Sequence, residues 1–522
     1  MSNSWGSVVV VAASLCACTV YRFPEVHELP RPIPPESVVV STPVKVHLLS
    51  GATVVYPRGL RVVNGLLLNP SPRQRPLRYD LTLQNATPVD SAIPLDSVMA
   101  FETFRNSIDA PASIALSLVG TAATAVAAGV LAVAIFGSCP TVYTDSAGTP
   151  ALEAEGFSYS IAPLFEARDV DALRGGADST GVLRLEIRNE AMETHYINQI
   201  GVWQVVRGAA ESILPVPAGQ PVAVRLLSAP ATAIDRAGRD VRAALVAADG
   251  QVFSSAPEVL DRVSPDDVED AIDLTFPRPA GQDSAVIVLR LRNSLLNTVL
   301  LYELMLGDPG LRALDWVGHD LHRVGPAARL GQWYGRTFGL RVAVRDGPVL
   351  RAVGRVADTG PIAWKDVAVV VPVPTRGDSL RVRFSFVADD WRIDRVALAG
   401  AWRRLVPRAL APVAVTDSAA RPDTGALARL RDADERYVVT QPGSRFYVRV
   451  VAEPAPPDSA AAFLLVMQGY YIEWLRGQWV RPHLTGAAFQ PGNDAVVEAL
   501  RRWRRKAPEL ERRFYASRFP VR

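Results

Sequence analysis

The chain has 522 residues, of which 49% are hydrophobic and 21% are charged. This balance is typical of a globular protein and excludes an intrinsically disordered one, and the length predicts about three or four domains. The formal net charge is only +3, so bulk electrostatics do not make the whole chain a binder of polyanions. The three cysteines match neither a disulfide framework nor a zinc-ligand pattern.

The N-terminus, 1–18, predicts an export signal. Its apolar run has the length of a secretory signal and is too short to span a membrane. The run ends in Leu15-Cys16-Ala17-Cys18, which resembles the lipobox of bacterial lipoproteins. The resemblance implies cleavage before Cys18 and attachment of acyl chains to this cysteine. No Lys or Arg precedes the run, so a cleaved signal without lipid or an uncleaved anchor is the alternative.

A small β domain is expected at 36–108. Its strand-like runs are separated by turn signals, of which Asn64-Gly65 is the strongest, because both residues of such a hairpin turn need positive φ. The pattern predicts a small antiparallel β-meander or barrel that is a platform more readily than an active site. His47 has no nucleophile near it in the sequence, and we interpret it as a structural or solvent-facing histidine.

Residues 111–137 predict a hydrophobic helix of the membrane type. The segment has no charged residue, and its apolar core of about 23 residues would extend about 35 Å as a helix. The alternative is an alanine-rich helix buried within a soluble protein. One flank carries small side chains four positions apart, which let another helix, including a second copy of this one, pack closely in lipid: Gly120, Thr124, Ala128 and Ala132.

A lipid on Cys18 and a full membrane span at 114–136 differ in the side of the membrane on which they place the rest of the chain. The lipid lies outside the cytoplasm, so a helix that crosses would return the rest of the chain to the cytoplasm. Arg105 precedes the segment and no Lys or Arg follows until Arg168, which argues weakly the other way. We therefore expect a helix that dips into the membrane or packs in an oligomer, with the β-rich body on the periplasmic or exterior side of the bacterial envelope.

The remainder predicts a mainly β fold, with tandem β-sandwich-like domains at 138–306 and 307–490. Strand–loop–strand units alternate apolar residues with Arg or Glu, as sheets with one solvated face require. These units fall at 182–206, 285–306, 380–398 and 445–474.

The first two units share a short motif. Arg188-Asn189 is followed by Thr194, and Arg292-Asn293 is followed by Thr298 at the same spacing. Duplication and chance similarity of hairpins explain this equally well.

The body also resembles uncharacterised bacterial envelope proteins. The resemblance covers most of the chain after the hydrophobic segment and implies an envelope location, but it supplies no catalytic residues. It rests on the stretches 138–143, 189–190 and 193–196.

A metal site is expected at Asp315, His319 and His322. A helix through 311–322 would place all three on one face, and a carboxylate with two imidazoles suits a divalent cation. Gly318 interrupts the segment, so a polar surface turn is the alternative.

A ligand-binding loop is expected at Glu190, Glu193 and His195. The three follow an Asn-terminated strand and could bind calcium or a sugar. The alternative is an ordinary solvated hairpin loop.

The C-terminal stretch 491–522 predicts a basic amphipathic helix and tail. Val496, Leu500 and Trp503 form one stripe, and arginines supply the other face. The helix would lie on an anionic membrane surface or dock on the β-rich body. Nucleic acid is an unlikely partner for an exported chain.

No nucleophile elbow, phosphate-binding loop, zinc-protease motif or dinucleotide fingerprint is present in the sequence. We expect a non-catalytic, membrane-attached envelope protein without cofactor, which acts as a scaffold or binds a partner protein or glycan through its β domains. Its other expected partners are membrane lipid and a second copy of itself through the hydrophobic helix. The alternative is a metal- or carboxylate-dependent hydrolase acting on cell-envelope glycans.

Overall fold

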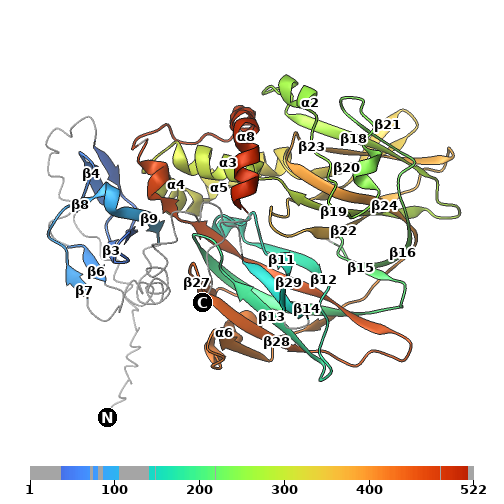
Figure 1. Cartoon of the computed structure of the whole chain (residues 1–522), viewed down its shortest axis with the longest axis horizontal. Coiled ribbons are helices and arrows are strands. Elements are labelled where there is room, and N and C mark those ends of the chain that lie inside the picture. The colour runs from blue at the N-terminus through green and yellow to red at the C-terminus, as the bar shows by residue number, and fades with distance from the viewer. Residues whose placement is uncertain are drawn as a thin grey trace, which may run out of the picture.

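The computed structural model describes residues 37–70, 75–79, 86–104, 140–146, 149–217, 219–482 and 484–514. Within these ranges, no helix is both long enough and apolar enough to cross a membrane. Several predictions lie outside the described residues: the export signal with Cys18, and the hydrophobic segment 111–137 with Gly120, Thr124, Ala128 and Ala132. The described fold is mainly β, with antiparallel sheets and a layer of helices (Figure 1).

Two small sheets form the N-terminal part. Their strand orders are β1-β4-β5-β8 and β30-β9-β2-β3-β6-β7. The expected turn at Asn64-Gly65 is confirmed, since both residues have positive φ between β4 and β5. The strands are β1 (Val38–Val40), β2 (Val44–Leu48), β3 (Thr53–Tyr56), β4 (Leu60–Val63), β5 (Leu66–Leu68), β6 (Leu77–Tyr79), β7 (Ala86–Pro88), β8 (Ile93–Pro94), β9 (Val98–Thr103) and β30 (Leu475–Arg476).

Strand β30 ties this part to the rest of the chain. Leu475 and Arg476 pair with Phe101 and Ala100 of β9, so a segment near the C-terminus supplies one edge of the six-stranded sheet. The expected domain at 36–108 is therefore completed by residues far away in the sequence.

Two five-stranded sheets, here called sandwich A, face each other across one buried core. Their strands are ordered β11-β10-β13-β28-β26 and β12-β29-β14-β25, and β27 also pairs with β14. Leu185, Ile200 and Val448 lie in the shared core. The strands are β10 (Thr141–Ser146), β11 (Thr149–Glu155), β12 (Ala167–Leu173), β13 (Val182–Arg188), β14 (Glu193–Arg207), β25 (Arg408–Leu410), β26 (Ala414–Asp417), β27 (Val438–Thr440), β28 (Arg445–Val451) and β29 (Ala460–Glu473).

A second pair of sheets, sandwich B, has the orders β15-β16-β24-β19-β22 and β17-β18-β23-β20-β21. Ile287, Phe384 and Trp391 lie in its core. The strands are β15 (Ser212–Leu214), β16 (Val222–Ser228), β17 (Thr232–Asp235), β18 (Glu269–Pro277), β19 (Ser284–Asn293), β20 (Leu340–Asp346), β21 (Val349–Val356), β22 (Lys365–Pro372), β23 (Ser379–Val387) and β24 (Trp391–Arg404).

Sandwich B is inserted into sandwich A. All strands of sandwich B fall between β14 and β25, which belong to the same sheet of sandwich A. The division therefore differs from the expected domains 138–306 and 307–490, because the two halves of sandwich A are separated by about two hundred residues of intervening chain.

A helical layer lies between the small sheets and sandwich B (Figure 1). It shares one core with the small sheets. Its helices are α3 (Leu296–Val299), the π-helix η4 (Leu300–Gly307), α4 (Arg312–Gly318), α5 (Val324–Thr337), α7 (Gly477–Val480) and α8 (Asn493–Phe514), whereas α2 (Pro257–Arg262) and α6 (Thr424–Leu430) lie elsewhere. Short 3₁₀ turns are η1 (Leu95–Ser97), η2 (Pro163–Phe165), η3 (Arg242–Leu245) and η5 (Asp320–His322).

Helix α8 packs on the body with the face that the sequence marks as apolar. Val496, Leu500 and Trp503 are buried in the core that the helical layer shares with the small sheets. On the polar side, Arg502 pairs with Asp308 and Lys506 pairs with Glu303. Of the two predictions for this helix, docking on the β-rich body agrees with these contacts. The apolar stripe packs against other residues of the protein.

Candidate functional site

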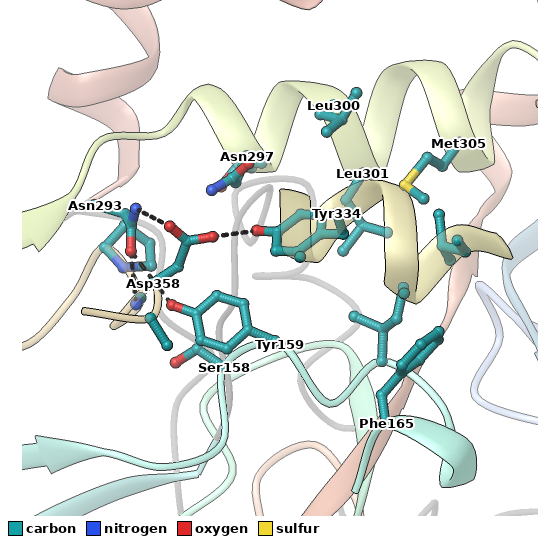
Figure 2. Close-up of a pocket in the computed structure, with 18 of the residues that line it drawn as sticks. Ser158, Tyr159, Phe165, Asn293, Asn297, Leu300, Leu301, Met305, Tyr334 and Asp358 are labelled. Carbon is teal, nitrogen blue, oxygen red and sulfur yellow. Dashed lines mark hydrogen bonds between the residues drawn. The ribbon is translucent and has the colours of Figure 1, made fainter. Parts of the chain in front are cut away.

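The described residues surround a cavity of about 280 Å³ where sandwich A, sandwich B and the helical layer meet (Figure 2). Its walls come from the loop between β11 and β12, the end of β19 with α3 and η4, helix α5, and the segment that follows β21. The volume is close to the lower end of the range for small-molecule sites, about 300–1,000 Å³.

The π-helix η4 forms the apolar wall. Its widened turn is visible in the backbone bond from the Asp308 N–H to the Glu303 carbonyl, which spans five residues. Leu300, Leu301 and Met305 of this helix line the cavity. π-Helices are rare in proteins, and those that do occur often lie at functional sites. A strand was expected here, because a short apolar run does not distinguish a strand from a buried helix.

Phe165 and Leu330 face this wall from the other side of the cavity. Phe165 lies in η2, and Leu330 lies in α5. Gly331 lets the two elements approach, since a Cβ at this position would lie 2.8 Å from the Phe165 ring. The cavity is therefore narrow and mainly apolar at this end.

Asp358 organises the polar end. Its Oδ2 accepts a 2.5 Å hydrogen bond from the Tyr334 hydroxyl, and its Oδ1 accepts bonds from Asn293 Nδ2 at 3.2 Å and from the Gly339 N–H at 3.1 Å. Figure 2 shows these side chains converging beside Tyr159. Both oxygens of the carboxyl are thus held by donors of the protein.

Asn293 joins the elements around that carboxyl. Its Oδ1 accepts hydrogen bonds from the N–H groups of Thr359 at 2.6 Å and Gly360 at 3.2 Å. Asn189, the other asparagine of the short sequence motif, also closes the end of a strand, because its Nδ2 donates to the carbonyls of Glu193 and Thr440. The asparagines therefore have related structural roles.

Burial disfavours full ionisation of the acidic groups at the polar end. Burial raises the pKa of Asp358, and burial together with repulsion from Asp358 raises the pKa of Asp390 well above its usual range. Each buried carboxyl would repel the other if both were ionised, which favours retention of a proton on the pair. Burial also raises the pKa values of Tyr159 and Tyr334 well above those of exposed tyrosines.

The structure does not bring Asp315, His319 and His322 together as the expected metal site requires. Helix α4 ends at Gly318, where a side chain would collide with Thr42, so the two histidines do not continue its face. Asp315 Oδ1 instead accepts four hydrogen bonds from Ser41 and Thr42, at 2.7 to 3.0 Å. No three His, Cys, Asp or Glu side chains of the described ranges are grouped so that they could hold a metal ion.

Glu190, Glu193 and His195, expected as a ligand-binding loop with a solvated hairpin loop as the alternative, do not lie together in an exposed loop. All three are buried, and the last two lie in β14. Glu190 Oε2 accepts hydrogen bonds from Thr141 and Tyr143, both at 2.6 Å. Glu193 Oε1 lies 2.7 Å from His195 Nε2, and burial raises the pKa of Glu193 to about 8 and lowers that of His195 to about 3.

A buried polar seam between the small sheets and sandwich A was not expected from the sequence. Glu102 of β9 lies 3.4 Å from the Lys45 ammonium and 3.2 Å from His47 Nε2, and it accepts a hydrogen bond from Thr194 of β14. His47 is buried, and its ring stacks on Trp474 with 4.1 Å between centroids. The histidine is therefore structural, as interpreted, and it does not face solvent.

No protein-family model matches the chain, and no curated protein matches it. Among solved structures, the secreted serine protease VesC from Vibrio cholerae is 10% identical with a TM-score of 0.14, over 49% of this chain and 56% of that protein. A GH31 α-xylosidase from Xanthomonas citri is 8% identical with a TM-score of 0.15, over 83% of this chain and 38% of the xylosidase. Similarities at this level carry no argument about fold or activity.

Proposed function

We propose that this protein is a non-catalytic binding protein of the bacterial envelope, which holds a small and mainly apolar ligand in the cavity at Asp358 and η4. The observation that carries the proposal is the cavity itself, with an apolar wall of Leu300, Leu301 and Met305 and a polar end organised by Asp358. Preformed apolar cavities with a few fixed polar groups are the usual form of small-molecule sites.

The envelope location is the part of the proposal that rests on the sequence. The lipobox-like Leu15-Cys16-Ala17-Cys18 supports attachment to membrane lipid, and the uncharged segment 111–137 supports a second contact with the membrane or with another copy of the chain. The sequence predicted that the β domains bind a partner protein or a glycan. We propose instead a ligand that is small enough for the cavity.

The geometry favours binding over hydrolysis. A catalytic carboxyl must reach the substrate, whereas both oxygens of Asp358 accept hydrogen bonds from Tyr334, Asn293 and Gly339. We therefore assign Asp358 the role of fixing the polar end of the cavity.

Filling the cavity tests this proposal. The variant Leu301→Trp adds a large side chain to the π-helical wall, and Val406→Trp places the same side chain at an aliphatic position that is 85% exposed and outside the lining. We expect 1-octanol to bind wild-type protein and Val406→Trp equally in calorimetric titrations, and to bind Leu301→Trp at least tenfold more weakly. Equal binding to all three proteins, or binding to none, would refute the assigned site.

A further inference from the structure

Arg355 brings a positive charge to the lining of the cavity from strand β21. Its Nε and Nη2 donate hydrogen bonds to the Phe338 carbonyl at 3.2 and 2.6 Å, which fixes the plane of the guanidinium. Gly339 leaves room for this group, since a Cβ there would lie 2.6 Å from Arg355 Nε. The other N–H donors, along the Nη1–Nη2 edge, have no partner among the described residues, and the side chain is exposed. This edge matches the two oxygens of a carboxylate.

The acidic pair of Asp358 and Asp390 is the competing charge. Burial raises both pKa values and favours retention of a proton, so we expect at most one negative charge on the pair near neutral pH. This charge and that of Arg355 oppose each other, and the charge of a ligand therefore depends on which group it can reach. Asp358 is only 5% exposed and accepts hydrogen bonds from protein donors at both oxygens, and Asp390 is fully buried. Arg355 is the accessible charge.

The rest of the lining suits an apolar chain of limited length. Leu300, Leu301 and Met305 of η4 face Phe165 and Leu330 across the cavity. A volume of about 280 Å³ equals about nine times the share of one molecule in liquid water, roughly 30 Å³, which leaves space for about ten non-hydrogen atoms. A charge among these apolar side chains would lose its hydration without gaining a partner. The charged end of a ligand must therefore lie away from η4.

We infer that the ligand is a small amphipathic monocarboxylate of about ten non-hydrogen atoms, whose chain lies along η4 and whose carboxylate accepts hydrogen bonds from the Arg355 guanidinium. This inference rests on the proposed binding function and names the ligand class of the same site. It makes Arg355 the residue that selects the charge, and Leu301 and Met305 the residues that accept the chain.

Three ligands with eight-carbon chains test the inference on the intact protein: octanoate, 1-octanol and octylammonium. We expect calorimetric titration at neutral pH to show that octanoate binds about fivefold more tightly than 1-octanol, as charge-assisted hydrogen bonds to an exposed guanidinium predict. Octylammonium should bind more weakly than both. The advantage of octanoate over 1-octanol should shrink when sodium chloride is raised from about 20 mM to about 500 mM, because salt screens the ion pair.

The variant Arg355→Gln removes the charge from the cavity. It should lower the affinity for octanoate to that for 1-octanol, and unchanged binding of 1-octanol shows that the cavity of this variant is intact. Arg351→Gln is the matched control, because Arg351 is exposed on the same strand and lies outside the lining. This control loses the same charge from the protein and should keep the wild-type preference for octanoate.

The possible results separate the two proposals. Equal affinities of wild-type protein for octanoate and 1-octanol, or a preference for octanoate that persists in Arg355→Gln, would overturn the ligand class while leaving a binding site in place. Tighter binding of octylammonium would also overturn it, because the Asp358–Asp390 pair would then set the preferred charge. No binding of any of the three ligands to wild-type protein would overturn the proposed function as well. The comparison on wild-type protein does not depend on the folding of any variant.

Discussion

Glu193 and Glu473 lie directly opposite each other on the neighbouring strands β14 and β29, and both are buried. Two carboxylates in this position would repel each other, and burial raises the pKa values of both although Arg476 lies 3.1 Å from Glu473 Oε1, which favours a proton on the pair. The Oε2 atoms of both residues have no other donor. A proton retained inside sandwich A therefore relieves the repulsion between these two side chains at the end nearest the small sheets.

The pair predicts that stability falls as the pH rises. Burial raises the pKa of Glu193 to about 8, above the value of about 4.3 expected in the unfolded chain. The stabilising contribution of the protonated pair is therefore complete below about pH 4, and it is lost as the pH rises toward about 8. We expect the thermal midpoint of wild-type protein to fall by several degrees between pH 5 and pH 8, measured by differential scanning calorimetry.

The variant Glu473→Gln tests the origin of that slope. The glutamine amide can donate to Glu193 at every pH, so the fall in thermal midpoint between pH 5 and pH 8 should become smaller. The Asp358–Asp390 pair acts in the same direction, because its pKa values are also raised, and it keeps part of the slope in the variant. Glu258→Gln, at an exposed position of α2, is the matched control and should keep the wild-type slope. A slope unchanged in Glu473→Gln would contradict the shared proton.

Asn293 should be far more important for stability than Asn297, although both lie near the cavity. Truncation of Asn293 to alanine removes one of the three donors to the buried Asp358 carboxyl and leaves the N–H groups of Thr359 and Gly360 without their acceptor. We expect a loss of about 3 kcal/mol in the free energy of unfolding, from about 1–3 kcal/mol for each unpaired buried group with partial relaxation. Asn297→Ala removes one hydrogen bond and should cost about 1 kcal/mol. Denaturant titrations of the two variants give the comparison, and equal losses would contradict this role.

Local patterns predicted the antiparallel strands but not the order in which they assemble. The alternation in 182–206 and 380–398 correctly marked β13 with β14 and β23 with β24, because one face of each strand is buried. In 285–306, β19 is confirmed, whereas the following apolar run is helical in α3 and η4. No local pattern in the sequence indicates that sandwich B is inserted into sandwich A.

The candidate site was missed for a related reason. Tyr159, Asn293, Tyr334 and Asp358 come from separate parts of the chain, and no spacing rule connects them. The sequence did mark Asn293, through its likeness to Asn189, but it gave no sign that the carboxyl bound to this asparagine lies far along the chain. Glu193 and His195 were marked as a loop, because the Asn-Glu run before them looks like a turn, and long-range pairing with β29 instead buries them.

Breaking the seam between the small sheets and sandwich A should strongly destabilise the protein. Although burial alone would raise the pKa of Glu102, the charge of Lys45 and the hydrogen bonds from His47 and Thr194 hold it at about 2, so the residue stays ionised. Lys45→Met leaves this buried carboxylate without its cation. We expect a loss of about 3–5 kcal/mol in the free energy of unfolding, with faster hydrogen exchange in β2 and β9.

The double variant Lys45→Met with Glu102→Gln separates the charge from the packing. Because no buried ion then lacks a partner, the double variant should be more stable than Lys45→Met alone, by about 1–2 kcal/mol. If the double variant is the less stable of the two, the Lys45–Glu102 ion pair is not the source of the loss.

Cys18 is the residue on which the proposed membrane attachment depends. If the lipobox-like sequence is used, a bacterial host supplied with an alkyne-tagged fatty acid should label wild-type protein and Cys16→Ser, but not Cys18→Ser. Cys16 is the matched control, since bulky Leu15 would stand directly before the cleaved bond if Cys16 were the acceptor. Labelling that persists in Cys18→Ser would contradict the lipoprotein resemblance. Fractionation of this unlabelled variant then tests for a membrane contact other than the lipid, which either an uncleaved apolar run before Cys18 or the segment 111–137 would supply.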